Sequence, residues 1–199
     1  MTSFDERAAT WDDPTKIERA GVVARAITDA VAPTTSTRLL EYGAGTGLVT
    51  QALRDEVGPV TLADTSAGMR AVMEQKVESG ALRDARIWAL DLSTDPAPDD
   101  RFDLIVTVLT LHHIPDLEPV LRAFAVLLAD GGRLCIADLE AEDGSFHGEG
   151  FEGHHGFDRA WLTERLERAG FADVAFRDCG TVARPDGDYP LFLATARLR

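Results

Sequence analysis

The chain has 199 residues, of which 45% are hydrophobic and 27% charged, a composition typical of one globular domain and not of a disordered chain. Its formal net charge of −14, without any cluster of Lys and Arg, argues against nucleic acid or an anionic membrane surface as a partner. The N-terminus is polar and acidic, and no apolar run reaches the ~20 residues needed to span a bilayer, so we expect a cytoplasmic protein. We expect it to be a monomer or a homodimer.

Short apolar runs alternate with longer amphipathic ones, which predicts an α/β fold with a parallel sheet and helices on both of its faces. In chain order, the first half is expected to form a helix at 14–31, a strand at 37–42, a helix at 48–57, a strand at 60–63, a helix at 66–79 and a strand at 85–90. The second half is expected to form a strand at 102–109, a helix at 117–129, a strand at 133–138, a helix at 158–169 and strands at 174–177 and 191–196. The last two strands have no helix between them and should therefore pair antiparallel at one edge of the sheet.

These elements follow one another with short connections, so residues 1–199 are expected to form a single domain. The exception is the segment 140–157, a long loop that carries acids, glycines and three histidines. Long loops in compact domains are usually functional or mobile.

Three glycines follow the first predicted strand and open the next helix: Gly43, Gly45 and Gly47. Glycine in such a turn lets the backbone bend sharply and lets a ligand approach it closely. The dinucleotide pattern Gly-x-Gly-x-x-Gly would need a glycine where Leu48 stands, and no triphosphate-binding Gly-x-x-x-x-Gly-Lys-Ser/Thr motif occurs. A cofactor without a pyrophosphate therefore fits this loop better than one that has it, and a tight turn without any ligand is the alternative.

Two acidic residues end the next two predicted strands, Asp64 the second strand and Asp91 the third. The carboxyl ends of parallel strands converge on the ligand crevice of such a sheet. A carboxylate at position 64 can accept hydrogen bonds from both hydroxyls of a ribose, and one at position 91 from the amino group of adenine. Either acid alone is compatible with a turn or a helix cap. Together with residues 43–47, which we call the glycine loop, the two acids indicate a nucleoside-containing cofactor.

Residues 39–47, Leu-Leu-Glu-Tyr-Gly-Ala-Gly-Thr-Gly, resemble the first motif of class I S-adenosylmethionine-dependent methyltransferases, of the broad group that includes the ubiquinone and menaquinone biosynthesis enzymes. Further likenesses lie at Asp64, Asp91-Leu92, 102–105, 111–114, 131–134 and 4–12. The resemblance covers nearly the whole chain. It implies a Rossmann-like doubly wound sheet of seven strands in the order 3-2-1-4-5-7-6, with the last strand inserted antiparallel, and it implies S-adenosylmethionine as the cofactor.

The same resemblance implies a set of cofactor-binding residues, namely Trp11, Glu41, Gly43, Gly45, Asp64, Met69, Asp91, Leu92 and Leu109. Gly43 would face the methionine part of the cofactor, Met69 would pack on the adenine or ribose, and Leu109 would lie beside the sulfonium. Glu41 would orient the loop or the cofactor's amino group. Residues 1–32 would form an N-terminal helical cap, from which Trp11 would close over the site or simply anchor the segment.

Methyl transfer from a sulfonium is an in-line displacement in which the protein mainly binds and orients, and a base is needed only when the nucleophile must lose a proton. The expected catalytic histidines are His155, in the loop 140–157 on the substrate side, and His113, which follows the fourth predicted strand. A solvated loop and a structural role are the alternatives. The histidines and glutamates of the loop match no known metal-ligand spacing, so no metal site is expected.

We therefore predict S-adenosylmethionine-dependent methyl transfer to a small-molecule acceptor, leaving S-adenosylhomocysteine. The sequence names neither the acceptor nor the atom that is methylated. One alternative is a module that binds the cofactor without transferring the methyl group. Another is a nicotinamide-dependent oxidoreductase, against which Leu48 and the final strand pair argue.

Overall fold

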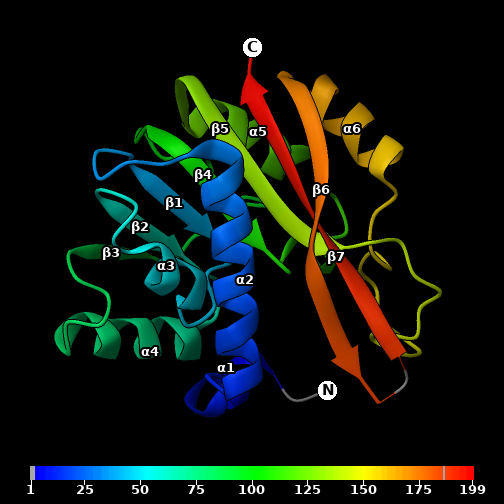
Figure 1. Cartoon of the computed structure of the whole chain (residues 1–199), viewed down its shortest axis with the longest axis horizontal. Coiled ribbons are helices and arrows are strands. Elements are labelled where there is room, and N and C mark those ends of the chain that lie inside the picture. The colour runs from blue at the N-terminus through cyan, green and yellow to red at the C-terminus, as the bar shows by residue number, and fades with distance from the viewer. Residues whose placement is uncertain (1–2, 186) are drawn as a thin grey trace.

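The computed structural model describes residues 3–185 and 187–199. Among these residues, seven strands form one sheet in the order β3-β2-β1-β4-β5-β7-β6 (Figure 1), which confirms the predicted order. The strands are β1 Leu39–Tyr42, β2 Val60–Ala63, β3 Ala85–Trp88, β4 Phe102–Val108, β5 Leu128–Leu139, β6 Phe171–Arg184 and β7 Gly187–Leu198. The first five strands pair in parallel, and β7 runs antiparallel between β5 and β6.

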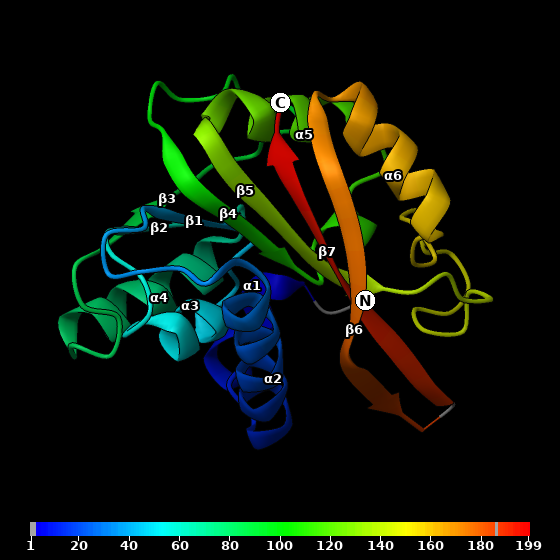
Figure 2. The ribbon, with the colours of Figure 1, turned by 45° about the horizontal axis from the view of Figure 1, so that its top comes forward.

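Helices cover both faces of this sheet, α2, α3 and α4 one face and α5 and α6 the other (Figure 2). The helices are α1 Phe4–Arg7, α2 Pro14–Val31, α3 Leu48–Leu53, α4 Ala67–Glu78, α5 Glu118–Leu127 and α6 Arg159–Arg168, with 3-10 turns η1 Ala8–Thr10 and η2 Leu111–His113. None of these helices, within the ranges that the structure covers, has the length and apolarity that a membrane crossing requires.

The core consists of two apolar layers separated by the sheet. Successive side chains of a strand point to opposite faces. Leu39 and Leu104 therefore belong to the same layer as Ile27 of α2, whereas Leu40 and Ile105 belong to the layer under α5 and α6. Burial on both faces explains why β4 is nearly continuous in apolar residues.

The final hairpin is longer than the sequence indicates. Strands were expected only at 174–177 and 191–196, but β6 and β7 extend to Arg184 and Gly187. The pairing of β7 with β5 ends at Leu191, so the tip of the hairpin continues beyond the sheet (Figure 1). The bounds of the other strands differ little from the predicted ones, except that β5 begins at Leu128 and not at position 133.

The N-terminal segment is fixed to the loops that follow β1 and β2. Of the expected cap 1–32, the first two residues lie outside the described ranges. Asp5 accepts hydrogen bonds from the Ser66 hydroxyl (2.5 Å) and the Gly68 amide (2.8 Å) at the start of α4. Asp12 pairs with Lys76 of α4 (2.6 Å), and its other carboxylate oxygen accepts a hydrogen bond from the hydroxyl of Thr46 in the glycine loop.

Candidate functional site

A cavity of about 440 Å³ lies at the carboxyl ends of β1, β2 and β4, between the sheet and the N-terminal segment. This volume is within the range of about 300–1,000 Å³ that is usual for small-molecule sites. The cavity is lined by all of the predicted site residues except Leu92 and His155: Trp11, Glu41, Gly43, Gly45, Asp64, Met69, Asp91, Leu109 and His113.

The glycine loop brings the ends of β1 and β4 into direct contact. Gly43 and Gly45 adopt left-handed backbone conformations, with φ of 68° and 57°. A Cβ atom at Gly43 would lie 2.2 Å from the Cγ2 atom of Thr110, whose hydroxyl donates to the Gly43 carbonyl (3.2 Å). The loop therefore requires glycine at this position for its conformation and for space.

The carboxylate of Asp64 is held by backbone amides at the end of β2. Its Oδ2 atom accepts a hydrogen bond from the Gly45 amide (2.7 Å), and its Oδ1 atom accepts one from the Ser66 amide (2.8 Å). Burial raises the pKa of Asp64, and these two hydrogen bonds oppose that effect. Each carboxylate oxygen has a second lone pair, so the side chain can still accept hydrogen bonds from a ligand.

Glu41 is a buried acid in the wall of the cavity. Its side chain is 3% exposed, and its Oε2 atom accepts a hydrogen bond from the Thr50 amide (2.9 Å). Burial raises the pKa of Glu41 to about 7, and repulsion from Asp64 adds to the effect. The cavity thus contains an acid that ionises near neutral pH.

Helix α2 brings two cations to the cavity that the sequence analysis missed, Lys16 and Arg19. Lys16 pairs with Asp13, and its Nζ atom lies 4.9 Å from the centroid of the Trp11 ring. Burial lowers the pKa of the Arg19 guanidinium. The sequence did contain a signal for Arg19. It lies four residues before Val23, which also lines the cavity, and residues four apart share one face of a helix.

The chain turns sharply where β4 ends in the cavity. Leu109 has a φ of 52°, although it is not glycine, and its amide donates to the carbonyl of Ala137 in β5 (2.8 Å). Non-glycine residues in this conformation cost on the order of 1–3 kcal/mol and are frequent at functional sites. The turn places Leu109 in the cavity wall and Thr110 against Gly43.

Leu92 and His155 lie outside the lining of the cavity. Leu92 is buried, and its amide donates to the hydroxyl of Tyr42 (3.1 Å), a residue that lines the cavity itself. The side chain of His155 is 43% exposed, and its Nδ1 atom lies 3.2 Å from Glu142. The cofactor contact of Leu92 and the catalytic role of His155 stay predictions.

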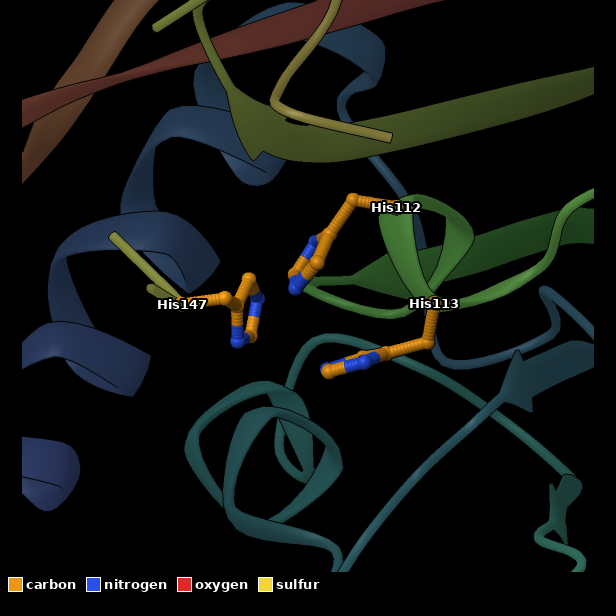
Figure 3. A group of neighbouring side chains, drawn as sticks. All are labelled: His112, His113 and His147. Carbon is orange, nitrogen blue, oxygen red and sulfur yellow. The ribbon is translucent and has the colours of Figure 1, made fainter. Parts of the chain in front are cut away.

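Beside the cavity, three histidines converge from two segments of the chain. His112 and His113 belong to η2, and His147 comes from the loop 140–157 (Figure 3). Burial lowers the pKa of His113 to about 3 and that of His147 to about 4. Both imidazoles are therefore neutral at pH 7, and only His113 of the three also lines the cavity.

The chain matches a known protein family. Residues 16–175 match the family model described as a methyltransferase domain. The ubiquinone biosynthesis O-methyltransferase of Xylella fastidiosa (strain 9a5c) is 36% identical over 110 residues, which cover 54% of this chain and 44% of that protein. Methyltransferase GfsG of Streptomyces halstedii is 30% identical over 135 residues, covering 65% of this chain and 49% of that protein. The chain thus spans less than half the length of these curated relatives.

Solved structures share the fold at lower identity. A chain of the complex between the Haloferax volcanii Trm112 methyltransferase activator and a methyltransferase has a TM-score of 0.78 at 18% identity, covering 99% of this chain and 98% of that one. Phosphoethanolamine N-methyltransferase 2 of Haemonchus contortus has a TM-score of 0.72 at 15% identity, covering 100% of this chain and 60% of that one. With the strand order and the extent of the family match, the chain belongs to the methyltransferase-domain family of Rossmann-like fold.

Proposed function

We propose that this chain binds S-adenosylmethionine in the cavity and transfers the methyl group to a small-molecule acceptor, with S-adenosylhomocysteine as the product. The observation that carries the proposal is the convergence of the glycine loop, Asp64 and Asp91 on one cavity at the carboxyl ends of parallel strands. The Haemonchus structure of the same fold is a complex with S-adenosyl-L-methionine, which supports the same cofactor here.

The polar groups of the cavity fit the two halves of this cofactor. Asp64 has lone pairs for the ribose hydroxyls, and Asp91 lies in the wall for the adenine amino group. At the methionine end, ionised Glu41 would attract the ammonium group, and Arg19 with Lys16 would attract the carboxylate. Opposite charges at close range in a partly buried site favour binding more than they do in water.

When bound, S-adenosylmethionine supplies an electrophilic methyl group. The chain's residues then bind and orient, and the apolar wall that includes Leu109 and Met69 excludes water from the reacting atoms. His113 is a weak base because burial lowers its pKa to about 3, far below the value near 7 that suits a general base. The neutral imidazole can accept a hydrogen bond.

A small molecule is the acceptor class that the observations favour. The net charge of −14 repels nucleic acid, and relatives of the chain are named as ubiquinone biosynthesis O-methyltransferases. We propose that the described segments suffice for cofactor binding, since the residues of the cavity wall come from 4–115.

Calorimetric titration with S-adenosylmethionine, S-adenosylhomocysteine and a nicotinamide dinucleotide tests the proposal. Selective binding of the two adenosyl ligands is the expected result, and binding of the dinucleotide alone would overturn it. Asp64→Ala should weaken the binding of S-adenosylhomocysteine on the order of 100-fold, because two hydrogen bonds to a charged group, each worth about 1.5 kcal/mol, are lost. Asp55→Ala is the matched control, since the side chain of Asp55 is 91% exposed and remote from the lining.

Transfer itself is tested by incubating the chain with S-adenosylmethionine and a panel of small phenols, acids, amines and thiols. Release of S-adenosylhomocysteine that depends on an acceptor is the expected result. Tight binding of the cofactor without release for any acceptor class would instead favour a binding module.

A further inference from the structure

The three histidines beside the cavity have the arrangement of a metal site. One potential ligand atom from each of His112, His113 and His147 lies within 4.8 Å of the others. Figure 3 shows the three imidazoles turned toward a common space, two from η2 and one from the loop 140–157. The ring centroids of His113 and His147 lie 4.1 and 5.1 Å from that of His112, and 5.0 Å from each other.

The orientation of His112 is determined by a buried carboxylate. Its Nδ1 atom lies 2.5 Å from Oδ1 of Asp138, and the two side chains are only 2% and 1% exposed. The carboxylate accepts, so Nδ1 donates and the free lone pair of the ring is on Nε2. This Nε2 atom is buried and has no hydrogen-bond partner among the described residues.

A carboxylate behind a histidine is the usual outer shell of a metal-bound imidazole. The carboxylate selects the tautomer, fixes the ring and makes the ligating nitrogen more basic. A buried nitrogen without a partner is otherwise costly, because its interaction with water is lost. In His112 both features occur together, and the unpartnered Nε2 is on the ring edge opposite Asp138.

Aromatic neighbours hold the other two rings. His147 stacks on Phe151 with a centroid distance of 3.8 Å and an interplanar angle of 17°. His113 meets the edge of Phe4 at 5.3 Å. In the part of the chain that the structure covers, Nε2 of His147 is a second buried nitrogen without a partner.

A backbone hydrogen bond holds the loop 140–157 against η2, and further hydrogen bonds within the loop fix its shape. The amide of His154 donates to the carbonyl of His112 (2.7 Å), and the amide of Glu142 donates to the carbonyl of His155 (2.9 Å). The Glu142 carboxylate accepts from the amide of Phe146 (3.0 Å), next to His147. The convergence of the three rings is therefore supported by the fold of the loop.

We infer that His112, His113 and His147 bind one divalent transition-metal ion of the Zn²⁺ type through imidazole nitrogens and leave a further position open. Three histidines with an open position are the ligand set of catalytic zinc. In a tetrahedral site with Zn–N distances of about 2.0–2.1 Å, the ligand nitrogens lie about 3.4 Å apart. The potential ligand atoms now lie within 4.8 Å of one another, so side-chain movements of about 1 Å would bring them to this spacing.

The place of the cluster suggests what the ion would do, and this step rests on the proposed function. His113 lines the cavity, so the open position is beside the site of transfer. An acceptor O–H or S–H group bound there would become more acidic and would give its proton to water. The freed lone pair would form the bond to the methyl carbon while the carbon–sulfur bond of the cofactor breaks, which would leave S-adenosylhomocysteine and the methylated acceptor.

The test is a titration of the full chain with Zn²⁺ after treatment with a chelator, followed by calorimetry, and with Co²⁺, followed by visible absorption. We expect one ion per chain and an absorption spectrum typical of four-coordinate Co²⁺. His147→Ala should weaken binding at least 100-fold. The matched control is His155→Ala, from the same loop, since His155 is outside the cluster. Absence of binding, or the same affinity in wild type and His147→Ala, would overturn the inference, and so would equal losses in both variants.

Asp138→Asn tests the positioning role of the carboxylate behind His112. We expect a 10- to 100-fold lower metal affinity, as found on loss of outer-shell partners. A far-UV spectrum equal to that of wild type excludes unfolding as the cause, and unchanged affinity would refute the role of Asp138. Separate titration with S-adenosylhomocysteine distinguishes the two proposals: metal binding without cofactor binding refutes the proposed function alone, and the reverse result refutes the metal site alone.

Discussion

Glu41→Gln isolates the electrostatic effect of the buried acid in the cavity wall. Glutamine keeps the shape of the side chain and an oxygen that can accept the Thr50 amide hydrogen, but it cannot ionise. The substitution therefore removes a titration without removing a contact. We expect the stability of the variant relative to wild type to depend on pH.

The sign and size follow from the raised pKa. Glu41 ionises near 4.5 when unfolded and at about 7 in the fold, so between these values the folded state holds more protons than the unfolded state. The contribution of Glu41 to the free energy of unfolding therefore falls as pH rises from 4.5 through 7. At about 1.4 kcal/mol per pKa unit the full effect is about 3 kcal/mol, most of which develops between pH 5 and pH 8.

Urea unfolding of wild type and Glu41→Gln at pH 5 and pH 8 measures this effect. The variant should gain about 2 kcal/mol relative to wild type between the two pH values, because the comparison cancels the titration of other groups. Glu74→Gln, at an exposed position of α4, is the control for the loss of a surface carboxylate. A difference between Glu41→Gln and wild type that stays the same at both pH values would refute a desolvated acid at this site.

Two further substitutions test the cavity. Arg19→Ala should weaken the binding of S-adenosylhomocysteine about 10-fold in calorimetry. Arg25→Ala, at an exposed position of the same helix, should leave the affinity unchanged. Equal effects of the two substitutions would contradict a direct role for Arg19. Gly43→Ala should destabilise the chain by about 1–3 kcal/mol in thermal or urea unfolding, because its Cβ would overlap Thr110. Combination with Thr110→Ala should recover part of the loss, and full stability of Gly43→Ala alone would show that the close approach is absent.

The strand order was predictable, but the length of the final hairpin was not. Alternation of side chains identifies a strand only while its register is unbroken. β6 has register shifts between Ala172 and Ala175 and between Asp178 and Thr181, and each shift changes which residues face the core. The shifts leave too few alternating residues in sequence to indicate a strand from Phe171 to Arg184.

The part of the cavity lining that follows the strands was predictable because its position depends on the sheet alone. In a parallel sheet, residues that follow neighbouring strands meet at one edge, and Gly43, Asp64 and Asp91 all line the cavity there. Lys16 and Arg19 were missed because cations of an amphipathic helix usually face solvent. Here α2 packs on one face of the sheet, and its first turns reach the carboxyl ends of the strands, so Lys16 and Arg19 line the cavity.

The histidine cluster shows where sequence reasoning ends. The approach of His112 to Asp138 follows from the sheet, because β4 and β5 are neighbours and both residues lie at their carboxyl ends. The position of His147 follows from no periodicity, since the loop 140–157 is shaped by backbone hydrogen bonds and by left-handed Gly156. Those contacts turn His155 toward Glu142 and place His147 over η2. Metal-ligand spacing patterns describe ligands that are close in sequence, so they do not detect a site assembled from two segments more than thirty residues apart.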